Sequence, residues 1–141
     1  MNILSNKSSL QKLFHVARDK SISHRSIILG ALASESSFIK NILWGEDVQS
    51  TVEILRNLGC EIQVTEVNAN NATADISIEP YKFLKTEPSN LNLDCGNSGT
   101  TMRLMTGLLC NSRYPFSLIG DVSLTKRPMK RVVEPLKNLG F

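Results

Sequence analysis

Apolar residues recur along the first eighty positions in the spacing of alternating helices and strands. The predicted elements are helices around 27–32 and 52–58, and strands at 37–42, 60–64 and 75–78. Gly59 follows the second helix at the position where a glycine commonly ends one. An Asn/Ala-rich turn at 68–73 joins the last two strands as a hairpin. The pattern predicts the order helix, strand, helix, strand, strand.

An octet near the end of the chain repeats one near its middle. Residues 52–59 read VEILRNLG and residues 133–140 read VEPLKNLG, so six of eight positions are identical. A Ser/Thr-rich helix start with an arginine precedes each octet, carrying Arg25 in the first copy and Arg103 in the second. Such self-similarity indicates a duplicated βαβαββ unit.

The second copy stops at Phe141, where the first copy begins its hairpin. Its predicted strands lie at 91–94 and 116–119. We therefore expect one complete unit at about 19–80, most of a second at about 90–141, and a chain that is a piece of a longer one.

Composition restricts the function classes. Of the 141 residues, 41% are hydrophobic and 21% charged, which is ordinary for a globular domain. The net charge of +3 suits anionic small molecules at least as well as nucleic acid. No apolar run approaches the length of a membrane helix, and residues 1–18 lack a signal peptide's apolar core. We expect a cytoplasmic protein that binds no membrane.

Three cysteines, Cys60, Cys95 and Cys110, are too widely spaced to suggest a metal site. The two histidines, His15 and His24, have no partners at ligand intervals. We expect reduced, mostly buried thiols and no bound metal.

The segment 19–25, DKSISHR, places two cations and small hydroxyl side chains where a helix begins. Helix N-termini attract anions through their unpaired N–H groups, and Lys20, Ser21 and Arg25 add side chains suited to phosphate or carboxylate. The plainer alternative is an N-cap serine followed by a solvated basic face.

Two later segments repeat this character. In NSGTTMR at 97–103, Gly99 lets a ligand approach the backbone closely, and Ser98 or Thr100 can cap a helix. In TKRP at 125–128, Pro128 fits the first helical position, which leaves Lys126 and Arg127 at a helix start. The alternatives are a capping turn for the first segment, and a solvated charge run or a nucleic-acid patch for the second. No aromatic residues interleave with the basic run, so stacking on single strands is not expected.

Carboxylates suited to paired acid–base chemistry are missing from the pattern. Asp47 is expected as a helix N-cap, Glu53 and Glu134 on solvated octet faces, and Asp94 and Asp121 at strand ends near a ligand. Anion binding is the chemistry that the residues themselves predict.

Taken together, the segments 19–25, 97–104 and 126–129 resemble, in order and spacing, 5-enolpyruvylshikimate-3-phosphate (EPSP) synthase, or 3-phosphoshikimate 1-carboxyvinyltransferase. The sister UDP-N-acetylglucosamine enolpyruvyl transferases share the repeat architecture, but they typically have Lys-Asn where this chain has Lys20-Ser21. The resemblance departs at Ala17-Arg18, where family members usually carry Pro-Gly or Gly.

The resemblance implies a transfer of the enolpyruvyl group of phosphoenolpyruvate to the 5-hydroxyl of shikimate 3-phosphate, without metal or organic cofactor. Lys20 would touch both substrates and act as a catalytic residue. Ser21 and Arg25 would contact shikimate 3-phosphate, whereas Asn97, Gly99 and Arg127 would contact phosphoenolpyruvate.

The resemblance also implies a mixed α/β fold of repeated βαβαββ units, the inside-out α/β barrel of enolpyruvyl transferases. Residues 1–18, with an opening strand at 14–17, would belong to the other domain, and residues 19–141 would form part of the N-terminal domain. The acid–base carboxylates would lie outside the chain, so we expect this piece alone to be inactive, whereas the full-length enzyme would be a monomer.

Two alternatives stay open. The first is a non-catalytic anion- or nucleic-acid-binding module built on the same repeat. The second is a folding fragment that self-associates through unpaired strand edges.

Overall fold

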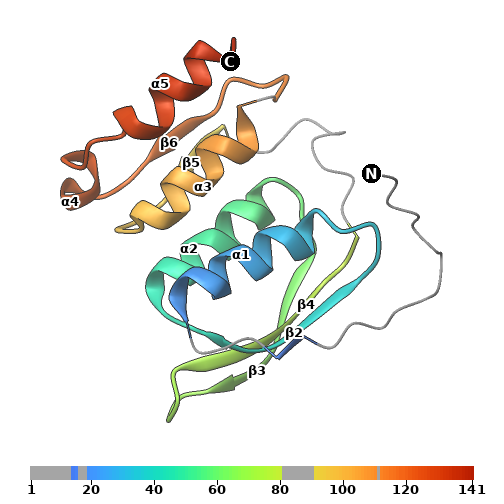
Figure 1. Cartoon of the computed structure of the whole chain (residues 1–141). Helices are drawn as coiled ribbons and strands as arrows, with labels where there is room; N and C mark the ends of the chain where they lie inside the picture. The colour runs from blue at the N-terminus through green and yellow to red at the C-terminus, as the bar shows by residue number, and fades with distance from the viewer. Residues whose placement is uncertain (1–13, 16–18, 81–90, 111) are drawn as a thin grey trace.

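A computed structural model describes residues 14–15, 19–80, 91–110 and 112–141. It has the mixed α/β architecture expected from the sequence, with two units stacked on each other (Figure 1). The elements of the first unit are β1 (Phe14–His15), α1 (Lys20–Ala31), β2 (Ser37–Leu43), α2 (Glu46–Asn57), β3 (Ile62–Asn68) and β4 (Thr73–Ile78). Those of the second are β5 (Asn92–Asp94), α3 (Gly99–Leu109), β6 (Ser117–Ile119), α4 (Val122–Thr125) and α5 (Lys130–Asn138).

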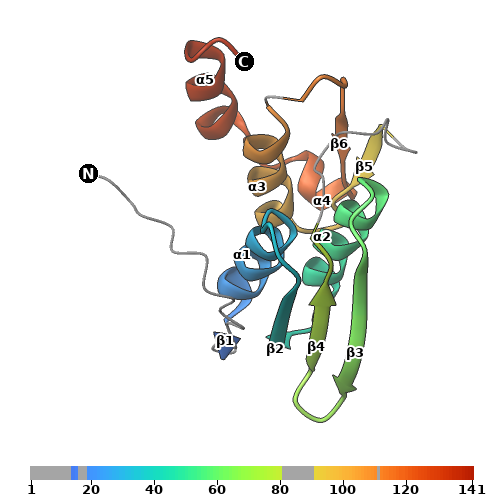
Figure 2. The same cartoon turned by 90° about the vertical axis from the view of Figure 1, so that its right-hand side faces the viewer.

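The first unit is a four-stranded sheet in the order β1-β2-β4-β3, with α1 and α2 on one face (Figures 1 and 2). β3 and β4 form the predicted antiparallel hairpin, and β4 pairs antiparallel with β2. Both pairings contain a bulge, and Asn41 in the β2 bulge has φ 58°, a conformation that asparagine tolerates better than most residues.

β1 is an edge strand of this sheet. It pairs in parallel with β2, with Phe14 opposite Ile39. The sequence had assigned the opening strand at 14–17 to another domain, but its two described residues pair within the first unit. Ala17 and Arg18 lie outside the described residues. The domain boundary at residue 18 therefore stays a prediction.

The core lies between this sheet and the two helices. Apolar positions three and four apart on α1 and α2 face the alternate inward positions of the strands, as the periodicity predicted. Fully or almost fully buried here are Ile27, Ala31, Ile39, Ile42, Val48, Val52, Leu55, Leu58, Ile76 and Ile78. Leu29 and Leu32, which the sequence placed in the same apolar run, are exposed instead.

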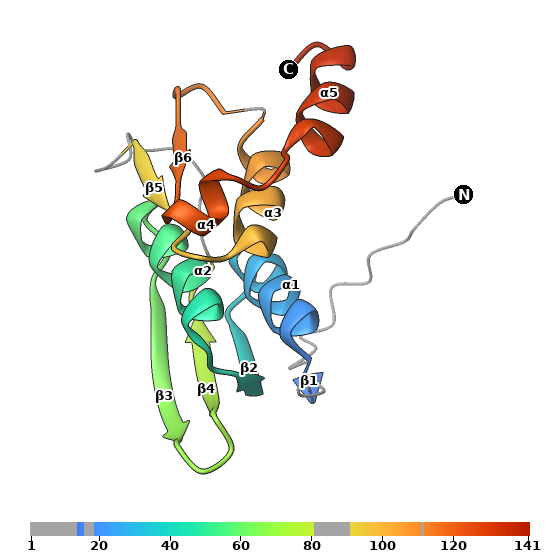
Figure 3. The same ribbon diagram turned by 90° about the vertical axis from the view of Figure 1, so that its left-hand side faces the viewer.

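The second unit repeats the opening of the first. β5 and β6 form a parallel pair, and α3 packs against α1 and α2 on the side away from the first sheet (Figures 1 and 3). α5 lies beyond α3 and carries the second octet, with Pro135 inside the helix as expected. The two octets therefore form helices in corresponding positions.

Two predicted helix starts, at Asp47 and at Pro128, are wrong in detail, and the alternative of a serine cap on the first helix is not found. The N-cap of α1 is Asp19, whose carboxylate accepts from the Ile22 N–H at 2.8 Å, so no serine caps this helix. Gly45 caps α2, which places Asp47 inside the first turn. Pro128 precedes α5 and its N-cap Met129, because the short helix α4, not predicted, occupies part of the connection.

Candidate anion-binding site

The N-terminal ends of α1, α2 and α3 lie on the same side of the molecule (Figure 1). Buried hydroxyls and an imidazole join them. His24 Nδ1 lies 2.7 Å from Thr51 Oγ1, which in turn lies 2.8 Å from Thr101 Oγ1. All three side chains belong to fully buried residues. One hydrogen-bonded chain therefore fixes the three helices relative to one another.

Lys20 and Asp47 form an ion pair between the first turns of α1 and α2. The Asp47 side chain is only 10% exposed, whereas that of Lys20 is 55% exposed. The Asp47 backbone carbonyl accepts from the Thr101 hydroxyl at 3.1 Å, whereas its carboxylate lies 3.8 Å from His24 Nε2, too far for a hydrogen bond. Asp47 thus links the cation of α1 to the start of α3.

His24 is neutral at physiological pH. Burial, followed by the positive charges of Lys20 and Arg25, lowers its pKa from 6.5 to about 4. A neutral ring can accept or donate at Nδ1, which suits the contact with the Thr51 hydroxyl. His24 is therefore an uncharged, buried residue that joins α1 to α2 through Thr51. Nothing indicates that it ligates a metal.

Gly99, the first residue of α3, lies beneath two guanidinium groups. A Cβ at this position would be 3.0 Å from Arg127 Nη1 and 3.2 Å from Arg103 Nη1. The neutral Ser98 caps the helix, since its Oγ accepts from the Thr101 N–H at 3.1 Å. The start of α3 thus combines helix N–H groups with two cations, which is a favourable environment for an anion.

Ser21 and Arg25 are four positions apart on α1, so they share one helix face. Arg25 is exposed and Ser21 half-buried, while Asn97 is exposed just before α3. The start of α1 differs from that of α3, because the Asp19 carboxylate already occupies it. Any anion at α1 must therefore be bound by side chains more than by the helix terminus.

The expected roles of the other carboxylates fit the structure only in part. Glu53 is exposed and paired with Arg56 at 2.6 Å, and Glu134 is exposed, as expected. Asp94 accepts from the Gly96 N–H and Asp121 caps α4, so both serve local turns. Within the described residues, the carboxylate beside the candidate cations is Asp47, and it is engaged with Lys20.

The two buried thiols, Cys60 and Cys95, offer no reactive site. Cys60, Cys95 and Cys110 are free, and burial raises the pKa of both Cys60 and Cys95 to about 12. Among the residues that the structure describes, no cluster of three or more His, Cys, Asp or Glu could hold a metal ion. No helix in the same set is long and apolar enough to cross a membrane.

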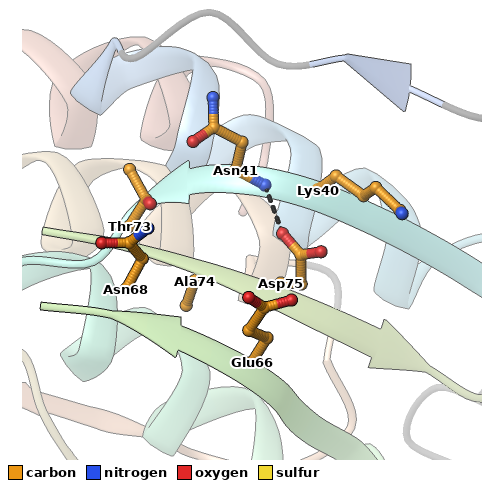
Figure 4. A pocket seen from close by; sticks show the side chains of 7 residues that line it. All are labelled: Lys40, Asn41, Glu66, Asn68, Thr73, Ala74 and Asp75. Atoms are coloured by element: carbon orange, nitrogen blue, oxygen red, sulfur yellow. Dashed lines mark hydrogen bonds between the residues drawn. The ribbon is translucent and has the colours of Figure 1, made fainter. Parts of the chain in front are cut away.

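A polar cavity of about 270 Å³ lies elsewhere, over the bulged strands of the first sheet (Figure 4). Asp75 accepts from the Asn41 backbone N–H at 2.7 Å there, and Lys40, Glu66 and Thr73 complete much of the lining. None of its residues comes from α1, α2 or α3. It is separate from the anion-binding site.

Sequence reasoning missed the buried groups that contact or lie behind the cations: His24, Thr51 and Thr101, and Asp47 as the partner of Lys20. A signal for two of them exists in the sequence. Thr51 occupies the helix face of Val48, Val52 and Leu55, and a polar residue on an apolar face is expected to have a buried partner. Thr101 is a second such position, beside the buried Met102 and Met105.

Comparison with known proteins identifies the family. The family model of EPSP synthase (3-phosphoshikimate 1-carboxyvinyltransferase) matches residues 4–141. The chain belongs to this family. The resemblance of the three motif segments is thereby confirmed, and so is the enolpyruvyl transferase fold class.

Relatives of the EPSP synthase family extend well beyond this chain. Two proteins named 3-phosphoshikimate 1-carboxyvinyltransferase, from Streptococcus pyogenes serotypes M2 and M1, are each 43% identical over 140 residues. The match covers 99% of this chain and 31% of each relative. A solved structure of EPSP synthase from Acinetobacter baumannii superposes with a TM-score of 0.76 at 36% identity, covering 92% of this chain and 28% of that one. The chain thus spans about a third of the length of the relatives that it matches.

Proposed function

We propose that this chain forms one wall of the substrate cleft of an enolpyruvyl transferase. In the complete reaction, the enolpyruvyl group of phosphoenolpyruvate passes to the 5-hydroxyl of shikimate 3-phosphate, and phosphate is released. This proposal agrees with the name of the S. pyogenes relatives, 3-phosphoshikimate 1-carboxyvinyltransferase.

One observation carries the proposal: a series of contacts runs from Lys20 to the start of α3, beside Arg127. Lys20 pairs with Asp47, the Asp47 carbonyl contacts Thr101, and Thr101 contacts the cap of α3. Gly99 follows that cap and lies under Arg127. Two motifs about a hundred residues apart in the sequence therefore lie side by side in one polar site.

Each proposed contact follows from the chemistry of its side chain. Lys20, Ser21 and Arg25 bind shikimate 3-phosphate, with the ammonium and guanidinium neutralising phosphate and carboxylate charge. Asn97, the Gly99 backbone and Arg127 bind phosphoenolpyruvate, together with Lys20. Lys20 is the catalytic residue, because a cation touching both substrates stabilises the charge that develops between them.

Binding without turnover is expected for the 141-residue chain. Proton transfer in such an addition and elimination requires an acid and a base, and the carboxylate at this site is already paired with Lys20. No metal or organic cofactor is part of the proposal. Enolpyruvyl transfer by the purified chain would contradict this expectation.

Titration of the chain with shikimate 3-phosphate, and separately with phosphoenolpyruvate, followed by NMR, tests the proposal. We expect shifts at residues 20–25 with the first ligand and at 97–99 with the second, both weakening as salt rises. Arg127→Gln should weaken phosphoenolpyruvate binding by about tenfold or more, since charge-assisted hydrogen bonds are lost. The matched control is Arg131→Gln, an exposed arginine at the start of α5.

Equal effects of the two substitutions, or no shifts at millimolar ligand, would count against the site. Tight oligonucleotide binding with a steep salt dependence and no response to shikimate 3-phosphate would instead favour the nucleic-acid-binding alternative.

A further inference from the structure

The sheet of the first unit has a polar face on the side away from α1 and α2. Ala74 and Ile76 of β4 are buried against the helices, so the alternate residues Thr73 and Asp75 lie on the opposite face. The polar cavity of about 270 Å³ lies on this face (Figure 4). Its side chains are therefore free of any part in the proposed substrate cleft.

Two carboxylates lie together in this cavity. Glu66 of β3 is directly opposite Asp75 of β4 in an antiparallel pair, which places their Cβ atoms about 5 Å apart. Both side chains line the cavity (Figure 4). Like charges in this arrangement destabilise a sheet, and within the described residues neither carboxylate forms an ion pair. The two negative charges therefore have no positive charge between them.

Lys40 is the cation that lines the cavity, but it does not neutralise this pair. Its side chain extends along β2 away from Asp75 (Figure 4). Its ammonium group lies 5.4 Å from the centre of the Phe38 ring, which is a cation–π distance. The positive charge of Lys40 is thus directed to an aromatic ring and not to the two carboxylates.

The bulge in β2 fixes the orientation of the Asp75 carboxylate. Its Oδ1 accepts from the Asn41 backbone N–H at 2.7 Å. An ionised carboxylate has about four lone-pair positions on its two oxygens, so Oδ2 retains its capacity to accept or to ligate. Asp75 is therefore an oriented ligand before any ion binds.

Thr73 contributes a hydroxyl that lacks a partner. It lies on the same face as Asp75, two residues earlier on β4 and opposite Asn68. The residue lines the cavity and is only 4% exposed, yet its hydroxyl has no hydrogen-bond partner in the part of the chain that the structure describes. Buried hydroxyl groups are normally satisfied, so a polar ligand in the cavity is expected.

The donor atoms indicate the class of this ligand. Carboxylate, amide and hydroxyl oxygens line the cavity, whereas no thiol or imidazole does. Hard divalent cations prefer such oxygen ligands, and the cavity has room for an ion together with water. Calcium suits it better than magnesium, because calcium accepts about six to eight oxygens in flexible geometry and magnesium requires a near-ideal octahedron.

We propose that this cavity binds a calcium ion between Glu66 and Asp75. Both carboxylates ligate the ion, and the Thr73 hydroxyl contacts it directly or through a water. The ion removes the repulsion between the two carboxylates and joins β3 to β4. It is a structural ion and takes no part in enolpyruvyl transfer. With two charged ligands, we expect a Kd of about 0.1 to 1 mM.

Calcium titration of the 141-residue chain without substrates, followed by amide NMR, tests the proposal. Signals of residues 66–68 and 73–75 should shift and saturate, whereas those of residues 20–25 should stay in place. Magnesium should bind at least about fivefold more weakly. Sodium chloride at the same ionic strength should give no saturable shift, because screening has no site to fill.

Glu66→Gln should weaken calcium binding by at least about tenfold, since one of two charged ligands is lost. In calcium-free buffer the same variant should unfold at a higher urea concentration than the parent chain, because the repulsion with Asp75 is removed. Glu61→Gln is the matched control. It removes the same charge from an exposed position just before β3, outside the cavity, and should leave calcium binding unchanged.

Three results would overturn the proposal. The first is no saturable shift at about 10 mM calcium, well above the expected Kd. The second is an equal loss of calcium binding in Glu66→Gln and Glu61→Gln, which would indicate diffuse charge attraction. The third is magnesium binding as tight as that of calcium. None of them bears on substrate binding, since the cavity shares no residue with the proposed anion site.

Discussion

Asp47 is ion-paired with Lys20 across the first turns of two helices, and its carboxylate is the more buried partner. Asp47→Asn should lower the free energy of unfolding at pH 7 by about 1 kcal/mol, because it removes the pair and a negative charge near the start of α2. The measurement is urea unfolding. Glu46→Gln removes the same charge from an exposed position of the same turn, and should cost no more than about half as much. Equal losses would show that the ion pair contributes nothing beyond the helix-terminus effect.

Much of the fold was predictable because it depends on local pattern. The spacing of apolar residues places α1 and α2, and the last glycine of each octet marks where α2 and α5 end. The duplicated octet also predicts that the two units correspond, because octets that share six of eight residues at equal positions in a repeat have similar packing requirements.

The polar contacts behind the site were not predictable in the same way. Asp47 has the residue type and place of a helix cap, and only the packing of α1 on α2 shows that its partner is Lys20. The contact between Thr51 and Thr101 joins residues fifty positions apart, and it depends on how α3 crosses α2. The start of α5 was also not predictable from the sequence. The short helix α4 lies in the connection, and α5 begins at Lys130 and not at Pro128.

Stability should fall in acid because His24 is held neutral. Its pKa is about 4 in the folded chain and 6.5 in the unfolded chain, so the unfolded state binds more protons between these values. Stability from this group is thus fully present above pH 6.5 and is lost as pH falls toward 4, with an upper limit of about 3 kcal/mol.

Unfolding free energies measured from pH 7 to pH 4 check this expectation. His24→Asn keeps a polar atom near Nδ1 but does not titrate, and it should flatten the slope between pH 6.5 and 4.5. An unchanged slope would assign the acid sensitivity to other groups. The His24 ring signals in NMR should titrate with a midpoint near 4 in the parent chain.

The hydroxyl of Thr51 should contribute more to the stability of the fold than its methyl group does. Thr51→Val leaves His24 Nδ1 and Thr101 Oγ1 without this buried partner, at a cost of about 1 to 3 kcal/mol. Thr51→Ser retains the hydroxyl and should cost about 1 kcal/mol for the lost methyl. Thermal unfolding shows which of the two variants is the less stable. A valine variant as stable as the serine variant would mean that the hydrogen-bonded chain does not stabilise the helix interface.

Gly99→Ala should impair phosphoenolpyruvate binding with little effect on folding. The added methyl would lie 3.0 Å from Arg127 Nη1, so the guanidinium must move away from the start of α3. Because Gly99 already has a helical conformation, alanine there favours the helix by up to about 1 kcal/mol and offsets the crowding. We expect at least about tenfold weaker binding, from the displaced cation and from the methyl blocking approach to the backbone N–H.

Gly107→Ala is the matched control, since it lies on the same helix and a Cβ there meets no atom within 4 Å. It should stabilise α3 to a similar extent and leave binding unchanged. NMR titration of both variants with phosphoenolpyruvate compares them directly. If the two bind alike, the start of α3 does not contact the ligand. If Gly99→Ala instead unfolds the chain, the guanidinium of Arg127 is fixed by the fold and cannot yield to the methyl.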